Sequence, residues 1–312
     1  MDRRTARAQP SPVTHRQHVC VIVAVAREAE AFAEGARAAG GTPIDDHPRR
    51  GPRSTLALRA AAATPSPAPD LVAWTPDLAF MLSGSTLCTI RTAGVGRVNA
   101  AVAATRAILS EEPPDVLVSA GVAGSLPPFE TTSSGAPSPA PPAAAASPAI
   151  GTLVLASEAV YAEEGLLGPD GFVTTDEMGF PLGPFSGNRI PADAELLERV
   201  EAAAQTLALS DARAIVRGPV ATVATCSGTD AGARTVAHRT AAIAEAMEGA
   251  AVLHVASVQR VPGLELRGIS NTTGDRPAQR WDLDAGLEAV SLAARALATV
   301  FSDPPAQSAR TD

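Results

Sequence analysis

Short continuous runs of apolar residues recur along most of the chain, and amphipathic stretches separate them. The runs have the length of β-strands and are apolar on both faces, which is typical of inner strands in a parallel sheet. The amphipathic stretches repeat apolar residues every three or four positions, most clearly over residues 192–207, which indicates helices. The strands expected from this pattern cover residues 19–26, 86–92, 115–120, 150–156, 214–225 and 264–270.

This alternation predicts one α/β domain over residues 18–302, folded as a three-layer α/β/α sandwich around a mixed sheet. Besides the helix at 192–207, helices are expected over residues 27–39, 97–109 and 249–258, and a last one is lined by Leu287, Val290, Ala294, Leu297 and Phe301.

Several segments lack this periodicity. Residues 1–17 and 303–312 are polar or rich in proline and are expected to be mobile tails. Residues 60–70 and 127–149 are rich in Pro, Ala, Ser and Thr, which predicts flexible insertions. Residues 158–187 hold many glycines and prolines and are expected to form a long loop.

Composition and charge narrow the classes of function. With 46% hydrophobic residues, the 312-residue chain can bury a sizeable core. A net charge of −8 disfavours binding to nucleic acid. Cys20, Cys88 and Cys226 are far apart without metal-ligand spacing, so we expect reduced thiols in the cytoplasm, no metal and no cofactor. No apolar run approaches the roughly 20 residues that cross a bilayer, so no membrane association is expected.

Small or polar residues follow the predicted strands, at the edge where open α/β sheets bind ligands. The Gly94-Val95-Gly96 turn is an incomplete dinucleotide fingerprint because Asn99 stands in place of the third glycine. A turn that presents backbone N–H groups to a small ligand is the safer interpretation. The turns or their flanks carry Glu28, Gly94, Gly121, Cys226 and Asn271.

Five motifs in order resemble the nucleoside phosphorylase and nucleosidase superfamily over most of residues 19–300. They read A-V-A-R-E, A-G-V-G-R-V-N-A-A, V-S-A-G-V-A-G-S-L, A-M-E-G-A-A-V and L-R-G-I-S-N. The ending R-G-I-S-N-T-T-G-D-R with Trp281 is most similar to the futalosine hydrolase family of menaquinone biosynthesis, whereas adenine-releasing nucleosidases usually read I-S-D. The resemblance implies that water cleaves the N-glycosidic bond of futalosine, giving hypoxanthine and dehypoxanthine futalosine.

The resemblance also implies roles for residues around the sugar. Glu248 accepts hydrogen bonds from the ribose hydroxyls, Met247 lies against the sugar, and Glu28 activates the attacking water. Phosphorolytic relatives carry an arginine in place of Glu28 and a hydroxyl in place of Val122, so this chain favours water over phosphate.

Without the motifs, structural roles explain several of these residues. Glu248 is then a solvated helix cap and Met247 a core side chain. Glu28 is then a first-turn residue stabilised by the helix dipole, and Glu30 is a rival for the role of base. His254, on an apolar helix, is more simply a hydrogen-bonded structural histidine.

By the same resemblance, Asn271 contacts the purine. An amide both donates and accepts hydrogen bonds and can match the N7 and O6 side of hypoxanthine, but it is no general acid. Asp275 either protonates the base or pairs with Arg276 or Arg280. Trp281 either covers the purine or sugar or is ordinary packing, and Arg276 and Arg280 are candidates for the carboxylate on the 5′ arm of the substrate.

Further contacts and partners follow from the resemblance. Relatives form dimers or larger oligomers in which a neighbour's loop closes the 5′ end of the pocket, and residues 158–187 are the candidate loop. The expected ligand is a small nucleoside. Backbone contacts are expected from Gly94, Gly121 and Ala123, while Cys226, Ser227 and Thr229 border the base.

Three alternatives remain. A methylthioadenosine or adenosylhomocysteine nucleosidase is disfavoured by Asn271, and a purine nucleoside phosphorylase is disfavoured by Glu28 and Val122. A non-catalytic nucleoside-binding module has no need of two carboxylates, Glu28 and Glu248, placed to act on water and sugar.

Overall fold

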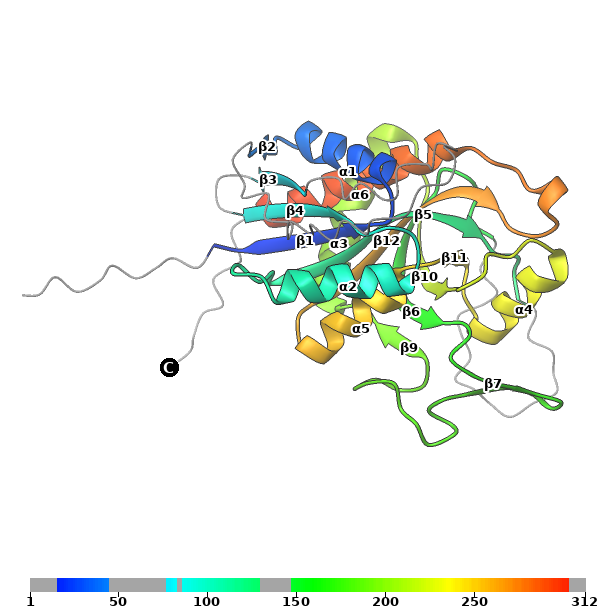
Figure 1. Cartoon of the computed structure of the whole chain (residues 1–312). Coiled ribbons are helices and arrows are strands. Elements are labelled where there is room, and N and C mark those ends of the chain that lie inside the picture. The colour runs from blue at the N-terminus through cyan, green and yellow to red at the C-terminus, as the bar shows by residue number, and fades with distance from the viewer. Residues whose placement is uncertain (1–15, 45–76, 83–85, 130–146, 303–312) are drawn as a thin grey trace, which may run out of the picture.

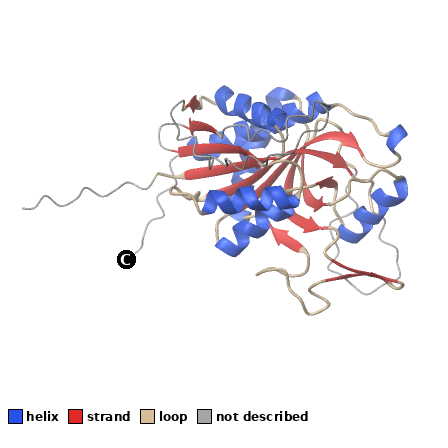
Figure 2. Ribbon diagram, in the orientation of Figure 1, coloured by secondary structure: helices blue, strands red, loops and turns tan. Residues whose placement is uncertain are grey.

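The computed structural model describes residues 16–44, 77–82, 86–129 and 147–302, and shows a mixed α/β fold with helices on both faces of a large sheet (Figures 1 and 2). The predicted fold class is confirmed. The strands are β1 His18–Val23, β2 Thr42–Pro43, β3 Leu78–Leu82, β4 Thr86–Thr92, β5 Val116–Ser125, β6 Leu153–Tyr161, β7 Gly165–Gly168, β8 Gly171–Thr174, β9 Arg189–Pro191, β10 Ile215–Thr222, β11 Ala244–Ala246 and β12 Gly263–Thr272. The helices are α1 Ala26–Ala38, α2 Arg97–Ile108, α3 Ala194–Asp211, α4 Asp230–Thr240, α5 Gly249–Gln259, the 3-10 turn η1 Arg276–Ala278 and α6 Leu283–Ser302.

The large sheet runs in the order β11-β10-β6-β12-β5-β1-β4-β3-β2, with β9 added beside β6. Strand β1 is parallel to both β4 and β5, and β12 is parallel to β5. Strand β11 pairs with β10 in parallel and with β5 in antiparallel orientation. The strands β5, β12, β6, β10 and β11 therefore close into a ring, which brings the chain just after β11 to the end of β5.

The core follows from the apolar runs. All six residues of β1 are buried, as expected for a strand covered on both faces. Helices α1, α3 and α6 pack together on one face of the sheet, and α2 and α5 pack on the other (Figure 1). The predicted insertion at 60–70, most of that at 127–149 and nearly all of both tails lie outside the described residues.

Helix α6 is long and apolar enough to cross a membrane by length and composition, with a mean hydropathy of 1.3. However, 61% of that stretch is buried inside the fold, against α1, α3 and the sheet. Burial of this extent in a folded domain is the environment of a core helix.

The prediction of a long loop over residues 158–187 is wrong in part. Residues 158–161 complete β6, and β7 and β8 form an antiparallel hairpin beyond it. The guanidinium of Arg239 lies 4.2 Å from the centre of the Phe172 ring, which ties this hairpin to α4. Helix α4 was not expected because only Ala233, Ala237 and Thr240 are buried along it, so its apolar periodicity is weak.

Candidate functional site

The carboxyl-terminal ends of neighbouring strands meet at one edge of the sheet. Because β4, β1, β5 and β12 are parallel neighbours, the turns that follow β1 and β4 lie beside the glycine-rich end of β5 and the end of β12. The motifs that carry Glu28, Gly94, Gly121 and Asn271 therefore come together from distant parts of the chain.

Glu28 lies in the first turn of α1 and is only 4% exposed. Its Oε2 accepts hydrogen bonds from the backbone N–H groups of Ala24 (2.9 Å) and Val25 (3.1 Å), which cap the start of the helix. Its Oε1 accepts a third from the N–H of Val122 on β5, at 2.9 Å. The first two contacts fit the structural interpretation of Glu28, but a simple helix cap requires neither the burial nor the contact with β5.

Arg267 on β12 is buried at the centre of this cluster, 1% exposed. Its Nη1 lies 3.4 Å from Oε2 of Glu248, its Nη2 donates to Oγ of Ser119 at 2.9 Å, and its Nε donates to Oε1 of Glu265 at 2.8 Å. The motif analysis assigned no role to Arg267. The sequence nevertheless indicated a buried ion pair, because Glu265 and Arg267 are two positions apart in an otherwise apolar strand and must lie on the same face of it.

Gly121 shows how closely these charges approach. A Cβ atom on Gly121 would lie 2.5 Å from Oε1 of Glu28 and 2.8 Å from Nη1 of Arg267, so any larger residue would displace them. The same Nη1 forms an ion pair with Glu248, so the guanidinium lies close to both carboxylates. The structure thus brings Glu28 and Glu248 to one site.

Glu248 stands at the start of α5, directly after Met247. Its Oε1 accepts a hydrogen bond from the N–H of Gly96 at 2.9 Å, and its Oε2 accepts one from the N–H of Met247 at 3.3 Å. The Gly94-Val95-Gly96 turn therefore directs a backbone N–H group at a site carboxylate, which orients it.

Burial and charge shape the ionisation of this cluster. Burial raises the pKa of Glu28 above its usual range, against the lowering effect of the Val122 N–H group and the Arg267 charge. Burial likewise raises the pKa of Glu265. Burial acts to lower the pKa of Arg267, but Glu265, Glu248 and Glu28 outweigh it and the pKa rises. Arg267 therefore stays charged, and within the described part of the chain it is the cation shared by these three carboxyl groups.

Asn271, which the sequence predicts to contact the purine, follows Arg267 on the same strand, β12. Oδ1 of Asn271 accepts a hydrogen bond from Oγ of Ser270 at 2.9 Å, and its Nδ2 donates to the carbonyl of Thr272 at 3.0 Å. Asn271 pairs with Gly124 of β5 from one side, and Glu245 of β11 pairs with Gly124 from the other. The amide and the chain leading to Met247 thus flank the same glycine.

The turn after β10 contacts the segment that carries Met247 and Glu248. Oε1 and Oε2 of the buried Glu245 accept hydrogen bonds from the N–H (2.8 Å) and Oγ (2.6 Å) of Ser227. Sγ of Cys226 lies 3.5 Å from Sδ of Met247. These contacts place Cys226 and Ser227 beside the Met247-Glu248 pair, and Glu245 is a polar support that the motif analysis missed.

A sequence model of the Phosphorylase superfamily matches residues 77–302. The futalosine hydrolase of Streptomyces coelicolor is 31% identical over 214 residues, which cover 67% of this chain and 77% of that protein. The futalosine hydrolase of Thermus thermophilus is 31% identical over 208 residues, which cover 65% of this chain and 78% of that protein. The chain belongs to the phosphorylase superfamily and, within it, to the futalosine hydrolase family. Its fold also matches a methylthioadenosine/adenosylhomocysteine nucleosidase from Neisseria meningitidis, with a TM-score of 0.60 and 19% sequence identity. The match covers 92% of this chain and 99% of that protein.

The family-specific ending after β12 lies at the surface. Oδ1 of Asp275 accepts a hydrogen bond from the N–H of Asp230 at 2.9 Å, so this carboxylate binds the start of α4 rather than Arg276 or Arg280. Trp281 is half exposed, with the Arg276 guanidinium 4.8 Å from the centre of its ring and its Nε1 donating to Gln279. Asp275 therefore joins the segment after β12 to the start of α4.

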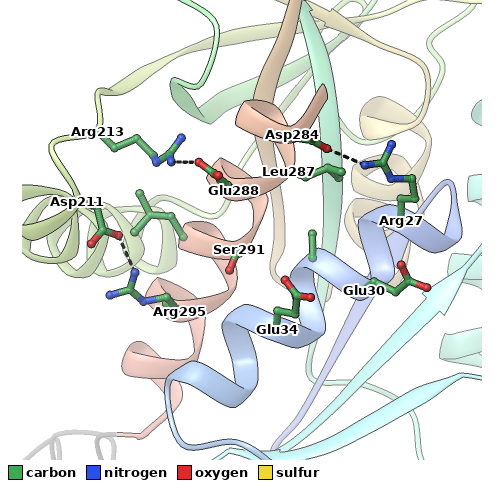
Figure 3. Close-up of a pocket in the computed structure, with 12 residues that line it drawn as sticks. Arg27, Glu30, Glu34, Asp211, Arg213, Asp284, Leu287, Glu288, Ser291 and Arg295 are labelled. Carbon is green, nitrogen blue, oxygen red and sulfur yellow. Dashed lines mark hydrogen bonds and ion pairs between the residues drawn. The ribbon is translucent and has the colours of Figure 1, made fainter. Parts of the chain in front are cut away.

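Two other candidates lie away from this site. Glu30 lines a groove of about 460 Å³ between α1, α3 and α6, where Arg27 pairs with Asp284 (Figure 3). None of the converging residues lines this groove, so Glu30 is not the rival that sequence spacing left open. Nδ1 of His254 lies 3.2 Å from the hydroxyl of Tyr161, consistent with a hydrogen-bonded structural histidine.

Proposed function

We propose that this protein hydrolyses the N-glycosidic bond of futalosine, releasing hypoxanthine and leaving dehypoxanthine futalosine. Family membership supports the substrate. The observation that carries the proposal is that Glu28 and Glu248 both lie close to the buried Arg267 guanidinium, at the edge of the sheet where α/β folds bind ligands. Two carboxylates close to one cation supply both a proton acceptor and a negative charge for a sugar cation.

In this proposal Glu248 holds the ribose. Its Oε1 binds Gly96 and its Oε2 faces Arg267, which fixes the carboxylate while leaving lone pairs for the 2′- and 3′-hydroxyls. Breaking the glycosidic bond gives the sugar oxocarbenium character, and a fixed carboxylate stabilises that charge in a site shielded from water. Met247 is assigned to the sugar face.

Glu28 is assigned to the water. The water oxygen forms a bond to C1′ while the bond from C1′ to the purine nitrogen breaks with its electron pair, and Glu28 accepts the water proton. The pKa of Glu28, raised by burial, makes it a better proton acceptor than an exposed glutamate. Its charge repels phosphate, and Val122 has no hydroxyl to bind that anion because its only donor, the backbone N–H, already bonds to Glu28.

Asn271 is assigned to the leaving base. Ser270 and Thr272 hold the amide, so its orientation is set before substrate binds. Hydrogen bonds from an amide to the N7 and O6 side stabilise hypoxanthine as it leaves as an anion, which then takes a proton from solvent. Because the anion takes its proton from solvent, this step uses no general acid, and Asp275 is assigned to its contact with the start of α4.

Purified protein given futalosine, inosine or methylthioadenosine, with and without phosphate, tests the proposal. We expect hypoxanthine from futalosine at a rate that phosphate does not change, measured by chromatography of the released base. Release of adenine from methylthioadenosine would instead indicate the alternative nucleosidase, and a requirement for phosphate would indicate a phosphorylase.

We also infer that the enzyme is a cytoplasmic homodimer or larger homo-oligomer acting in menaquinone biosynthesis. Val98 and Val102 are exposed one turn apart on α2, Leu109 is exposed directly after that helix, and Val258 is exposed on the neighbouring α5. An apolar stripe of this kind is typical of a surface that a second copy covers. Sedimentation velocity is expected to give at least twice the mass of one chain, and a monomer would contradict the inference.

A further inference from the structure

Glu265 is a buried acidic residue that the proposed reaction does not use. It is 0% exposed on β12, two residues before Arg267 and on the same face of the strand. A carboxylate removed from water is costly unless a charged partner and hydrogen bonds compensate it. A leucine or valine would fill this strand position without that cost, so the role of Glu265 lies in what its carboxylate contacts.

The first contact fixes a guanidinium. Oε1 of Glu265 accepts the hydrogen bond from Nε of Arg267 at 2.8 Å, while Ser119 accepts the one from Nη2 at 2.9 Å. Because a guanidinium is planar and rigid, holding two of its nitrogens sets the direction of the third. That third nitrogen, Nη1, is the one that faces Glu248 and lies beside Gly121 and Glu28.

The second contact is with the chain that carries Glu248. A Cβ atom on Gly249 would lie 2.0 to 2.1 Å from three atoms of the Glu265 carboxyl group, so the carboxylate packs directly against the first residue of α5. Within the described residues, Oε2 of Glu265 has no hydrogen-bond partner. The positive end of the α5 dipole lies there and stabilises its charge.

We propose that Glu265 is a positioning residue that holds the Arg267 guanidinium at the angle that pairs Nη1 with Glu248 and keeps it close to Glu28. The inference rests on the proposed function, because its purpose is to orient the groups assigned to water and ribose. It differs from a purely structural ion pair in predicting that the charge of Glu265 acts on the reaction through Arg267.

The charge effect has a definite sign. The charged groups that act on Glu28 from the elements packed against it are Arg267 on β12 and Glu248 before α5. Glu265 offsets part of the Arg267 charge. Replacing Glu265 by glutamine removes that offset, so Arg267 stabilises ionised Glu28 more strongly and the pKa of Glu28 falls. The acidic limb of kcat/KM then moves to lower pH.

The test compares Glu265→Gln with Glu265→Leu. Glutamine keeps an oxygen that can accept the hydrogen bond from Nε of Arg267. We therefore expect the glutamine variant to fold and the acidic limb of its kcat/KM profile to shift to lower pH. Leucine removes the acceptor, so we expect kcat to fall about 100-fold with KM nearly unchanged, as for a misplaced reacting group. Glu288→Gln, which breaks a surface pair with Arg213, is the matched control and should leave both quantities unchanged.

Nitrogen-15 NMR of labelled arginine gives a readout that needs no activity. The Arg267 Nε–H signal, assigned with Arg267→Lys, should exchange slowly with water in the wild type and in Glu265→Gln, and be lost by fast exchange in Glu265→Leu. A protected signal in the leucine variant, or an unshifted acidic limb in the glutamine variant, would overturn the proposal. A wild type that hydrolyses no nucleoside would instead contradict the proposed function.

Discussion

Glu28→Gln is expected to lower kcat for hypoxanthine release from futalosine by about 10²- to 10⁴-fold, the usual contribution of a positioned general base. The amide cannot accept the proton of the attacking water, although its oxygen can still accept the hydrogen bond from Val122 that joins α1 to β5. Initial rates of base release measure the effect. Glu30→Gln is the matched control, because Glu30 is exposed on the same helix and faces the groove in Figure 3.

The pH profile identifies the group. Burial raises the pKa of Glu28 above 4.5, its ordinary value, so kcat/KM of the wild type should fall on the acidic side at a pH above 4.5 as Glu28 takes up a proton. The residual activity of Glu28→Gln should lack this limb. An unchanged acidic limb in that variant, or an equal loss of activity in Glu30→Gln, would assign the base elsewhere.

Arg267→Met is expected to lower the free energy of unfolding by about 3–5 kcal/mol near neutral pH, the range for leaving buried charges without their partner. Methionine fills much of the same space but leaves Glu28, Glu248 and Glu265 without their cation. Urea denaturation measures the change. Arg295→Met, which removes a surface pair with Asp211, should cost no more than about 1 kcal/mol.

The stability deficit of Arg267→Met should depend on pH in one direction. Without the guanidinium, the folded-state pKa values of Glu28 and Glu265, already raised by burial, rise further. The folded protein then binds protons that the unfolded chain releases, so stability recovers as pH falls toward the unfolded-state pKa. The deficit relative to wild type should narrow from pH 8 to pH 5, and a deficit that does not vary with pH would contradict this account. If the methionine variant does not fold, Arg267→Lys, which keeps the charge, should fold.

Part of this architecture was accessible from residue patterns. The apolar run of β1 and the polar-to-apolar periodicity of α3 are local properties, and both elements form close to where they were expected. Elements with weak local signals were missed, such as β11, which has three residues and is held by strands on both sides. Tertiary pairing rather than intrinsic preference forms such short strands.

The sequence by itself determined the fold class, the family and the candidates Glu28, Glu248 and Asn271, because strand and helix periods and motif order are written along the chain. Only the tertiary structure decided that Glu28 rather than Glu30 faces β5, that Arg267 lies close to both carboxylates, and that Glu265 supports it. Glu28 and its partner Val122 are 94 positions apart. Contacts at such separations depend on which strands become neighbours in the sheet, and local hydrophobic periodicity does not encode that order.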